Sequence, residues 1–195
     1  MKKIRLLKKA KICISLAICI LIVGSFVGCG SKKTIADQPF GSFTTTDING
    51  NGVTEKIFTQ STLTMVNIWA TFCGPCINEM PDLGKLNTEY KDQGFQVVGI
   101  ILDSKNANDV TFDNIIESAK EIISDTGASY LHILPSKSLY AIKLNEVTAV
   151  PETVFVNSEG KVVSEIYMGS KSKAEWQSII ENLLKEQGMQ DEKSN

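Results

Sequence analysis

The sequence has a single histidine, His132, and only five cysteines in 195 residues. Three of the cysteines lie near the amino terminus: Cys13, Cys19 and Cys29. The rest of the chain therefore contains only Cys73 and Cys76. A structural zinc site needs four ligands, usually from two cysteine pairs or from one pair and two histidines. The sequence is too poor in these ligands for such a site, and we expect no metal and no cofactor.

The sequence also lacks a surplus of positive charge beyond its first 28 residues. Six of its 20 basic residues and none of its 22 acidic residues precede Cys29, so 14 basic and 22 acidic residues follow. Proteins that bind nucleic acids or anionic surfaces need clustered basic side chains that displace counterions from phosphates. We therefore expect no nucleic-acid partner, and proteins or small thiols are the expected partners.

The amino terminus has the pattern of a secretory signal. Basic residues up to Lys11 precede an uncharged apolar run from Ile12 to Gly28. The run ends in Phe26-Val27-Gly28-Cys29, which resembles the lipobox of bacterial lipoproteins and implies cleavage before Cys29 and lipidation of that cysteine. An uncleaved signal anchor is the alternative, because the 17 residues of this run are at the lower limit for a membrane span.

The length allows one ordinary domain in addition to the targeting segment. We expect a signal peptide over 1–28, a lipidated linker over 29–39, one folded domain over 40–190 and a polar tail over 191–195. Residues 30–39 are polar and without periodicity, which is typical of a linker.

Hydrophobic patterns in the domain predict an α/β fold. Two β-prone segments, 43–47 and 53–58, flank the turn Asn49-Gly50-Asn51-Gly52 and predict a hairpin. Short apolar runs predict strands at 63–70 and 95–102, with a helix from Pro75 to about Gln93 between them. This order predicts parallel strands joined by a right-handed crossover. The other expected elements are helices at 109–124, 139–144 and 174–187 and strands at 130–134, 152–157 and 161–168.

Cys73 and Cys76 form the candidate redox centre. They are separated by two residues at the point where a predicted strand is followed by a predicted helix. Cys73 would lie at the positive end of the helix, where unpaired N–H groups stabilise a thiolate. Cys76 would lie one turn into the helix, shielded but close enough to resolve a mixed disulfide.

The segment Trp69-Ala70-Thr71-Phe72-Cys73-Gly74-Pro75-Cys76 resembles the active-site motif of the thioredoxin superfamily, and most closely that of its extracytoplasmic TlpA/ResA-like branch. The runs Asn78-Glu79-Met80-Pro81 and Val150-Pro151-Glu152-Thr153 extend the resemblance, which covers roughly residues 40–187. It implies an α/β, thioredoxin-like fold: a central mixed sheet flanked by helices, with an N-terminal β-hairpin and a helical insertion.

The resemblance also implies roles for single residues. Pro151 is implied to be cis and to face the cysteines. Glu79 is the candidate acceptor of the Cys76 proton, because it follows Cys76 by three residues on the same helix face and ResA-like members have a glutamate at this spacing. The alternative is that Glu79 only complements the helix dipole. The remaining active-site loop residues are Trp69, Phe72, Gly74, Pro75 and Val150. We expect Phe72, which replaces a tryptophan common in the family, to preserve an aromatic wall.

Three residues outside the motif have simpler expected roles. His132 is expected to be a packed histidine, and Trp176 is expected to pack the last helix. Trp69 either belongs to the core or shields the cysteines.

The sequence thus predicts a reductase of protein disulfides on the extracytoplasmic face of the bacterial cell membrane, held there by a lipid anchor. The resemblance implies that a membrane electron donor of the CcdA/DsbD type recharges it. Three alternatives remain: an oxidase that donates its disulfide, a thiol peroxidase, and a non-catalytic lipoprotein that binds a partner. The sequence does not fix the reduction potential, which depends on the relative stability of dithiol and disulfide.

Overall fold

The computed structural model describes residues 39–194. Contacts within the chain divide it into the units Met1–Lys33 and Thr34–Asn195, and the described residues belong to the second unit. The expected signal peptide, the lipidation site Cys29 and the linker up to residue 38 lie outside the described residues. Among residues 39–194, no helix has the length and apolar character needed to cross a bilayer.

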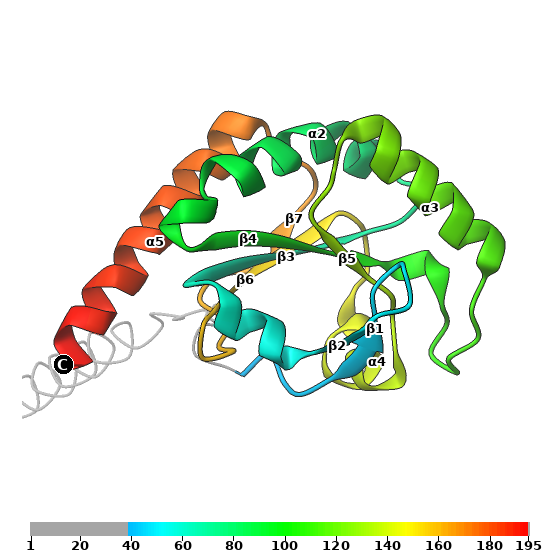
Figure 1. The fold of residues 1–195 in the computed structure, drawn as a ribbon, viewed down its shortest axis with the longest axis horizontal. Coiled ribbons are helices and arrows are strands. Elements are labelled where there is room, and N and C mark those ends of the chain that lie inside the picture. The colour runs from blue at the N-terminus through cyan, green and yellow to red at the C-terminus, as the bar shows by residue number, and fades with distance from the viewer. Residues whose placement is uncertain (1–38, 195) are drawn as a thin grey trace, which may run out of the picture. The chain divides into compact units, whose positions relative to one another are not determined.

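A mixed five-stranded sheet forms the centre of the domain (Figure 1). Its strands are β3 (Leu63–Trp69), β4 (Phe95–Ile101), β5 (Leu131–Ile133), β6 (Glu152–Asn157) and β7 (Tyr167–Met168). They are arranged in the order β5-β4-β3-β6-β7. The pairs β3–β4 and β4–β5 are parallel, whereas β6 is antiparallel to β3 and β7. This arrangement confirms the predicted mixed sheet.

Helices cover both faces of the sheet (Figure 1). One face carries the longer helices: α2 (Gly74–Glu89), α3 (Asp113–Thr126) and α5 (Lys173–Ser194). The other face carries the 3-10 helix η1 (Glu55–Gln60), α4 (Lys137–Ile142) and the hairpin of β1 (Thr44–Thr46) and β2 (Gly52–Thr54). Each side has its own buried cluster. All seven residues of β3 are buried because β3 lies between two paired strands and two covered faces.

Short 3-10 helices join several of these elements: η2 (Lys91–Gln93) follows α2, η3 (Leu102–Ser104) follows β4, and η4 (Leu144–Glu146) follows α4. The helix α3, between β4 and β5, occupies the place of the expected insertion. The strand β3 ends at Trp69 and α2 begins at Gly74, so the cysteine motif lies at the carboxyl edge of the parallel strands, as predicted.

Two predicted strands are wrong over most of their length. In the segment 53–58, β2 ends at Thr54, whose side chain accepts a hydrogen bond from the Lys56 N–H and begins η1. In the segment 161–168, only Tyr167 and Met168 form a strand. The hydroxyl of Ser164 accepts the Phe155 N–H at 3.0 Å. A side-chain oxygen thus replaces the backbone carbonyl that would accept this N–H if the two segments paired as regular strands. Both segments have the apolar residues on which the strand predictions rested, but most of their backbone does not form strands.

Several helix boundaries differ from the predicted ones, including the start of α3 and the end of α5. Residues 109–112 precede α3 as a loop, because the Asn106 side chain accepts the N–H groups of Asn108 and Val110, and Asp109 has a φ of 67°. At the carboxyl end, α5 continues beyond the predicted Gln187 to Ser194.

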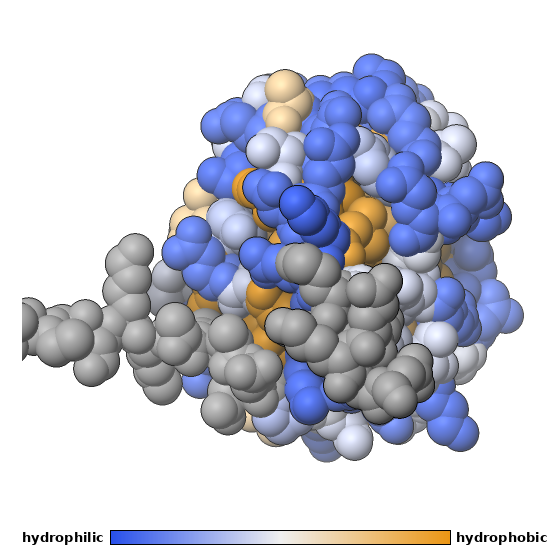
Figure 2. Space-filling model, turned by 90° about the vertical axis from the view of Figure 1, so that its left-hand side faces the viewer, coloured by the Kyte–Doolittle hydropathy of each residue, from blue (hydrophilic) through white to orange (hydrophobic). Residues whose placement is uncertain are grey.

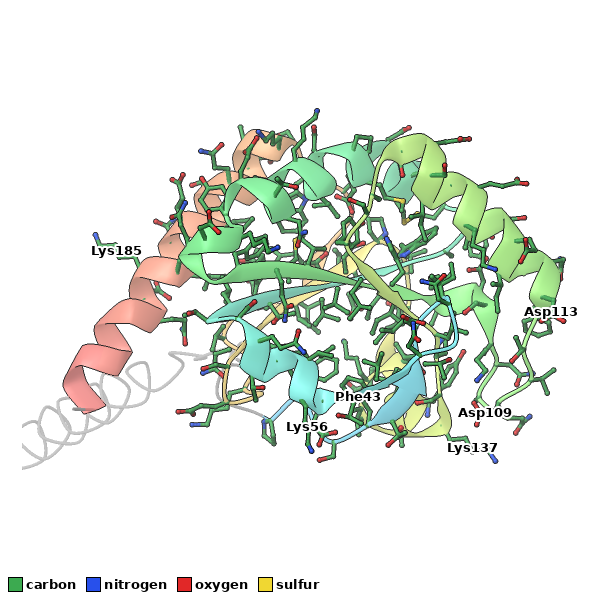
Figure 3. The ribbon with its side chains drawn as sticks, viewed as in Figure 1. Phe43, Lys56, Asp109, Asp113, Lys137 and Lys185 are labelled. Carbon is green, nitrogen blue, oxygen red and sulfur yellow. A yellow bond between two sulfur atoms is a disulfide. The ribbon has the colours of Figure 1, made fainter. Side chains whose placement is uncertain are left out.

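Charged side chains lie on the outside of the helical layer. Lys185 on α5 and Asp113 at the start of α3 point away from the domain (Figure 3). Hydrophilic residues also predominate on the side of the molecule at which α2 ends, where apolar residues occupy only smaller areas (Figure 2). The exposed apolar side chain of Phe72 is at the opposite end of α2, just before its first residue.

Candidate active site

The cysteine pair caps the amino terminus of α2. Cys73 is the N-cap residue, and its Sγ accepts the Cys76 N–H at 3.2 Å. Gly74 and Pro75 begin the first turn of α2. The N–H groups of a first turn have no acceptor within the helix, so a proline here costs no helical hydrogen bond. Cys73 and Cys76 form a disulfide with a Cα–Cα distance of 5.3 Å. The helix dipole and the nearby N–H favour negative charge on the Cys73 sulfur once the disulfide is reduced.

The two cysteines differ in accessibility. Cys73 has 6% of its surface exposed and Cys76 has 1%, and both contact the core between the sheet and the long helices. A substrate sulfur approaching from solvent therefore reaches Cys73 before Cys76. The order of nucleophile and resolving cysteine stays a prediction, and Cys73 is less exposed than the sequence suggested.

The loop between β3 and α2 is held by an aspartate that the sequence analysis missed. Asp103 in η3 accepts the Thr71 N–H through both carboxylate oxygens, at 3.2 and 3.1 Å, and also accepts the Thr71 hydroxyl. Its position immediately after a predicted parallel strand is the signal that could have identified it, because such residues meet at the same sheet edge. The neighbouring Phe72 is 77% exposed, and the aromatic wall expected of it stays a prediction.

Trp69 belongs to the core and is hydrogen-bonded to His132. The indole Nε1–H donates to His132 Nδ1 at 3.2 Å, and the other ring nitrogen, Nε2, lies 2.9 Å from the Ala128 carbonyl oxygen. Because a carbonyl oxygen only accepts, Nε2 must carry the imidazole proton, which leaves Nδ1 free to accept from Trp69. A Cβ at Gly99 would lie 2.5 Å from Nδ1, so glycine is required where the two rings meet. His132 is a packed residue, as expected, and it fixes Trp69.

The buried position of His132 predicts a pH-dependent stability. Burial lowers its pKa to about 4, although the hydrogen bond to Ala128 opposes this. Between pH 6.5 and 4 the unfolded chain binds a proton that the native protein does not bind, so the free energy of unfolding falls as pH falls through this window. The loss attributable to His132 is up to about 3 kcal/mol. Urea unfolding of the wild type and of His132→Gln at several pH values should show a shallower slope for the variant, and parallel slopes would contradict the prediction.

Val150 and Pro151 lie at the edge of the sheet where β3 ends. Their peptide bond is cis, as the resemblance implies. The strand β6 begins at the next residue, Glu152, which pairs with Ile68 of β3, and Val150 packs against the cluster that contains both cysteines. The structure therefore brings this segment to the same sheet edge as the cysteine motif.

Glu152 lies in the run that extends the resemblance, but nothing in the sequence indicates its ion pair. Its carboxylate forms an ion pair with Lys143, the residue that follows α4, and both side chains are almost fully buried. Removing either partner would leave the other charge buried and unpaired, which is strongly destabilising. The pair links the start of β6 to the side of the sheet opposite α2. Nothing in the sequence distinguishes Lys143 from the other lysines, of which the chain has 19 in total.

Glu79 is the acidic group beneath the cysteine motif. It is 4% exposed and lies three residues after Cys76 in α2. Oε1 accepts from Asn67 Nδ2 at 3.1 Å, and Oε2 accepts the Trp176 indole N–H at 3.1 Å and the Lys171 backbone N–H at 3.2 Å. Burial raises the pKa of Glu79 above its ordinary value, although these hydrogen bonds and the Lys171 charge oppose the rise. A group that is buried but still able to ionise is suited to proton exchange.

Comparison with known proteins identifies the family. A family model described as Redoxin matches residues 35–184, which is most of the chain. The chain belongs to the Redoxin family. The thiol-disulfide oxidoreductase ResA of Halalkalibacterium halodurans is 31% identical over 98 residues, which are 50% of this chain and 49% of that protein. ResA of Bacillus thuringiensis is 24% identical over 185 residues, which are 94% of this chain and 99% of that protein.

A solved structure of a related fold supports the architecture of this Redoxin family member. A thiol:disulfide interchange protein from Chlorobium tepidum superposes with a TM-score of 0.63 at 22% identity, covering 76% of this chain and 97% of that one. This likeness confirms the thioredoxin-like fold. The Redoxin match and the ResA relatives, together with the Cys73–Cys76 disulfide, identify a TlpA/ResA-like thiol–disulfide oxidoreductase of the thioredoxin superfamily.

Proposed function

We propose that this Redoxin family member is a reductase of protein disulfides, anchored outside the cytoplasmic membrane. The observation that carries the proposal is the disulfide between Cys73 and Cys76 across the start of α2, with Cys73 the more accessible sulfur. The thiolate of reduced Cys73 attacks one sulfur of a substrate disulfide, and the other substrate sulfur leaves as a thiolate. Cys76 then attacks the Cys73 sulfur, which releases the second substrate thiolate and forms the enzyme disulfide.

Two electrons and two protons must return to the enzyme after each cycle. The enzyme is left with the Cys73–Cys76 disulfide, and a membrane electron donor of the CcdA/DsbD type is the proposed source of the electrons. Gly74 and Pro75 between the cysteines resemble the reducing members of the superfamily and favour this direction. A protein disulfide is therefore the proposed oxidant, and the membrane donor is the proposed reductant.

Glu79 is the proposed acceptor of the Cys76 proton. Cys76 must lose its proton before it attacks the mixed disulfide, and a buried thiol resists ionisation. Glu79 lies one helical turn away in the same buried layer, and its carboxylate accepts hydrogen bonds from neighbouring groups. Pro151 and Val150, at the same sheet edge, are proposed to face the substrate beside Cys73.

The direction of electron flow is tested by equilibrating the purified domain with glutathione mixtures of known potential. A reductase should have a reduction potential below about −200 mV, in the region of thioredoxin and the glutaredoxins. A potential near −120 mV, about that of a strong disulfide donor, would support the oxidase instead. Alkylation followed by intact-mass measurement reports the dithiol fraction at each ratio.

Lipid attachment at Cys29 gives a separate prediction. Cells that express the full chain should contain a membrane-bound form that begins at Cys29, with a mass increased by the acyl groups. Replacing Cys29 with alanine should leave an unprocessed precursor or release the protein, because neither cleavage nor lipidation would occur. An unmodified native chain that begins at Met1 would show a signal anchor instead. Cys19→Ala is the matched control, since Cys19 lies within the apolar run and should not affect processing.

A further inference from the structure

The carboxylate of Glu79 joins two parts of the chain that are far apart in sequence. One oxygen, Oε1, is bound by Asn67 in the central strand β3. The other, Oε2, is bound by two N–H groups of the carboxyl-terminal part of the chain, from Lys171 and Trp176. The last helix therefore contributes directly to the surroundings of an acid on α2.

The indole that binds Glu79 is fixed by close packing. Trp176 has no exposed surface, and its ring contacts Phe155 and Tyr167 at centroid distances of 6.2 and 5.6 Å. The Lys171 ammonium lies 5.7 Å from the Trp176 ring and 5.5 Å from the Tyr167 ring. Because the ring has no room to turn away, its N–H is held toward Oε2. Packing alone would be satisfied by any aromatic ring, whereas the hydrogen bond needs the indole nitrogen.

We infer that Trp176 is a positioning residue for the active site, whose indole N–H orients the Glu79 carboxylate and sets its readiness to accept a proton. This inference rests on the proposed role of Glu79 and adds the group that controls it. A donor to a carboxylate stabilises the charged form, so it makes the carboxylate a weaker base. Loss of the indole N–H should therefore make Glu79 hold its proton more strongly.

The other titratable groups around Glu79 are few and can be followed separately. The Lys171 ammonium favours the ionised carboxylate. Burial raises the pKa of Tyr130, which precedes β5, and the negative charge of Glu79 raises it further. On its own helix, Cys76 precedes Glu79 by one turn. Asn67 and its partner Thr153 on β6 complete the surroundings and do not titrate.

The first test uses the unaltered protein with 15N-labelled tryptophan and 13C-labelled glutamate. The chain has two tryptophans, so two indole N–H signals are expected. The Trp176 signal should shift with pH along the same curve as the Glu79 carboxyl carbon, and Glu79→Gln should abolish the shift. The Trp69 signal is the internal control, because its N–H is bound to His132 and not to Glu79, so Glu79→Gln should leave its pH dependence unchanged. A Trp176 signal that stays constant while Glu79 titrates would overturn the inference.

The second test compares two changes of the same aromatic cluster. Trp176→Phe removes the N–H and keeps a ring, whereas Phe155→Leu loosens the packing around Trp176 and keeps the N–H. Trp176→Phe should raise the pKa of Glu79 by about 1 unit, the shift expected for loss of one hydrogen bond to a charged group. Phe155→Leu should shift it much less, because the indole N–H remains. Equal shifts in both variants would show that Trp176 acts only through packing.

The same variants separate this inference from the proposed function. If Glu79 accepts the Cys76 proton, the pH profile for resolution of the mixed disulfide should move upward in Trp176→Phe by the same amount as the pKa of Glu79. A raised pKa of Glu79 with an unmoved profile would retain the positioning role of Trp176 and contradict the role of Glu79 in the reaction.

Discussion

Replacing Cys73 with serine is expected to lower the turnover of a protein disulfide by on the order of a thousandfold or more, because a hydroxyl cannot form the mixed disulfide on which the cycle depends. Replacing Cys76 with serine should also stop turnover, but at a later step. The variant still forms the mixed disulfide and has no second thiol to resolve it. Cys76→Ser should therefore accumulate covalent partners, whereas Cys73→Ser should accumulate few.

This difference depends on the geometry at the start of α2. Cys73 is the more exposed of the two cysteines, and its sulfur accepts the N–H of Cys76, whereas Cys76 is almost fully buried in the core. Non-reducing gels and intact-mass measurement of cells carrying each variant would show the trapped species, with the double variant as a blank. Equal trapping by the two single variants would contradict the assignment of nucleophile and resolving cysteine.

The reactive pair could be predicted from the sequence because its geometry is local. Two residues between the cysteines and a helix beginning at Gly74 are enough to place one sulfur at the N-cap and the other one turn later. The same applies to Glu79. It follows Cys76 by three residues, and the helical repeat places two such residues on the same face. The main strands were predictable for a similar reason, since 63–69 and 95–101 are predominantly apolar, as a buried parallel sheet requires.

The partners of these residues could not be predicted in the same way. Thr71 and Asp103 are 32 residues apart, Trp69 and His132 are 63 apart, and Glu79 and Trp176 are 97 apart. Such contacts depend on the sheet order and on the angle at which each helix packs, and neither is encoded in a local pattern. Trp176 illustrates the limit: its spacing on the last helix predicts burial, and nothing in that spacing predicts a carboxylate at its indole nitrogen.

The failures in secondary structure have a related cause. Hydrophobicity at 53–58 is shared by a strand and by the buried face of η1, and the hydrogen bond to Thr54 decides between them. At 161–168 the hydroxyl of Ser164 replaces a backbone partner of Phe155. A hydrophobic pattern takes no account of single polar side chains, and such side chains determine the backbone in both segments.

Glu79→Gln is expected to slow the resolution of the mixed disulfide by about 100-fold, the lower end of what a positioned proton acceptor contributes. Formation of the mixed disulfide should change much less, because Cys73 is already stabilised as a thiolate by the helix start. In the wild type, resolution should also slow as pH falls through the raised pKa of Glu79, since only the ionised carboxylate accepts a proton. The variant should lack this part of the pH profile.

Rapid mixing with a chromogenic disulfide separates the two steps, since formation releases one thiolate of the reagent and resolution releases the second. Asp82→Asn is the matched control, because Asp82 is an acid on the same helix that is partly exposed and paired with Lys85. It removes the same charge without altering the buried layer and should leave both rates unchanged. If Glu79→Gln resolves the mixed disulfide at the wild-type rate over the whole pH range, water takes the proton, and Glu79 then contributes to the stability of α2 alone.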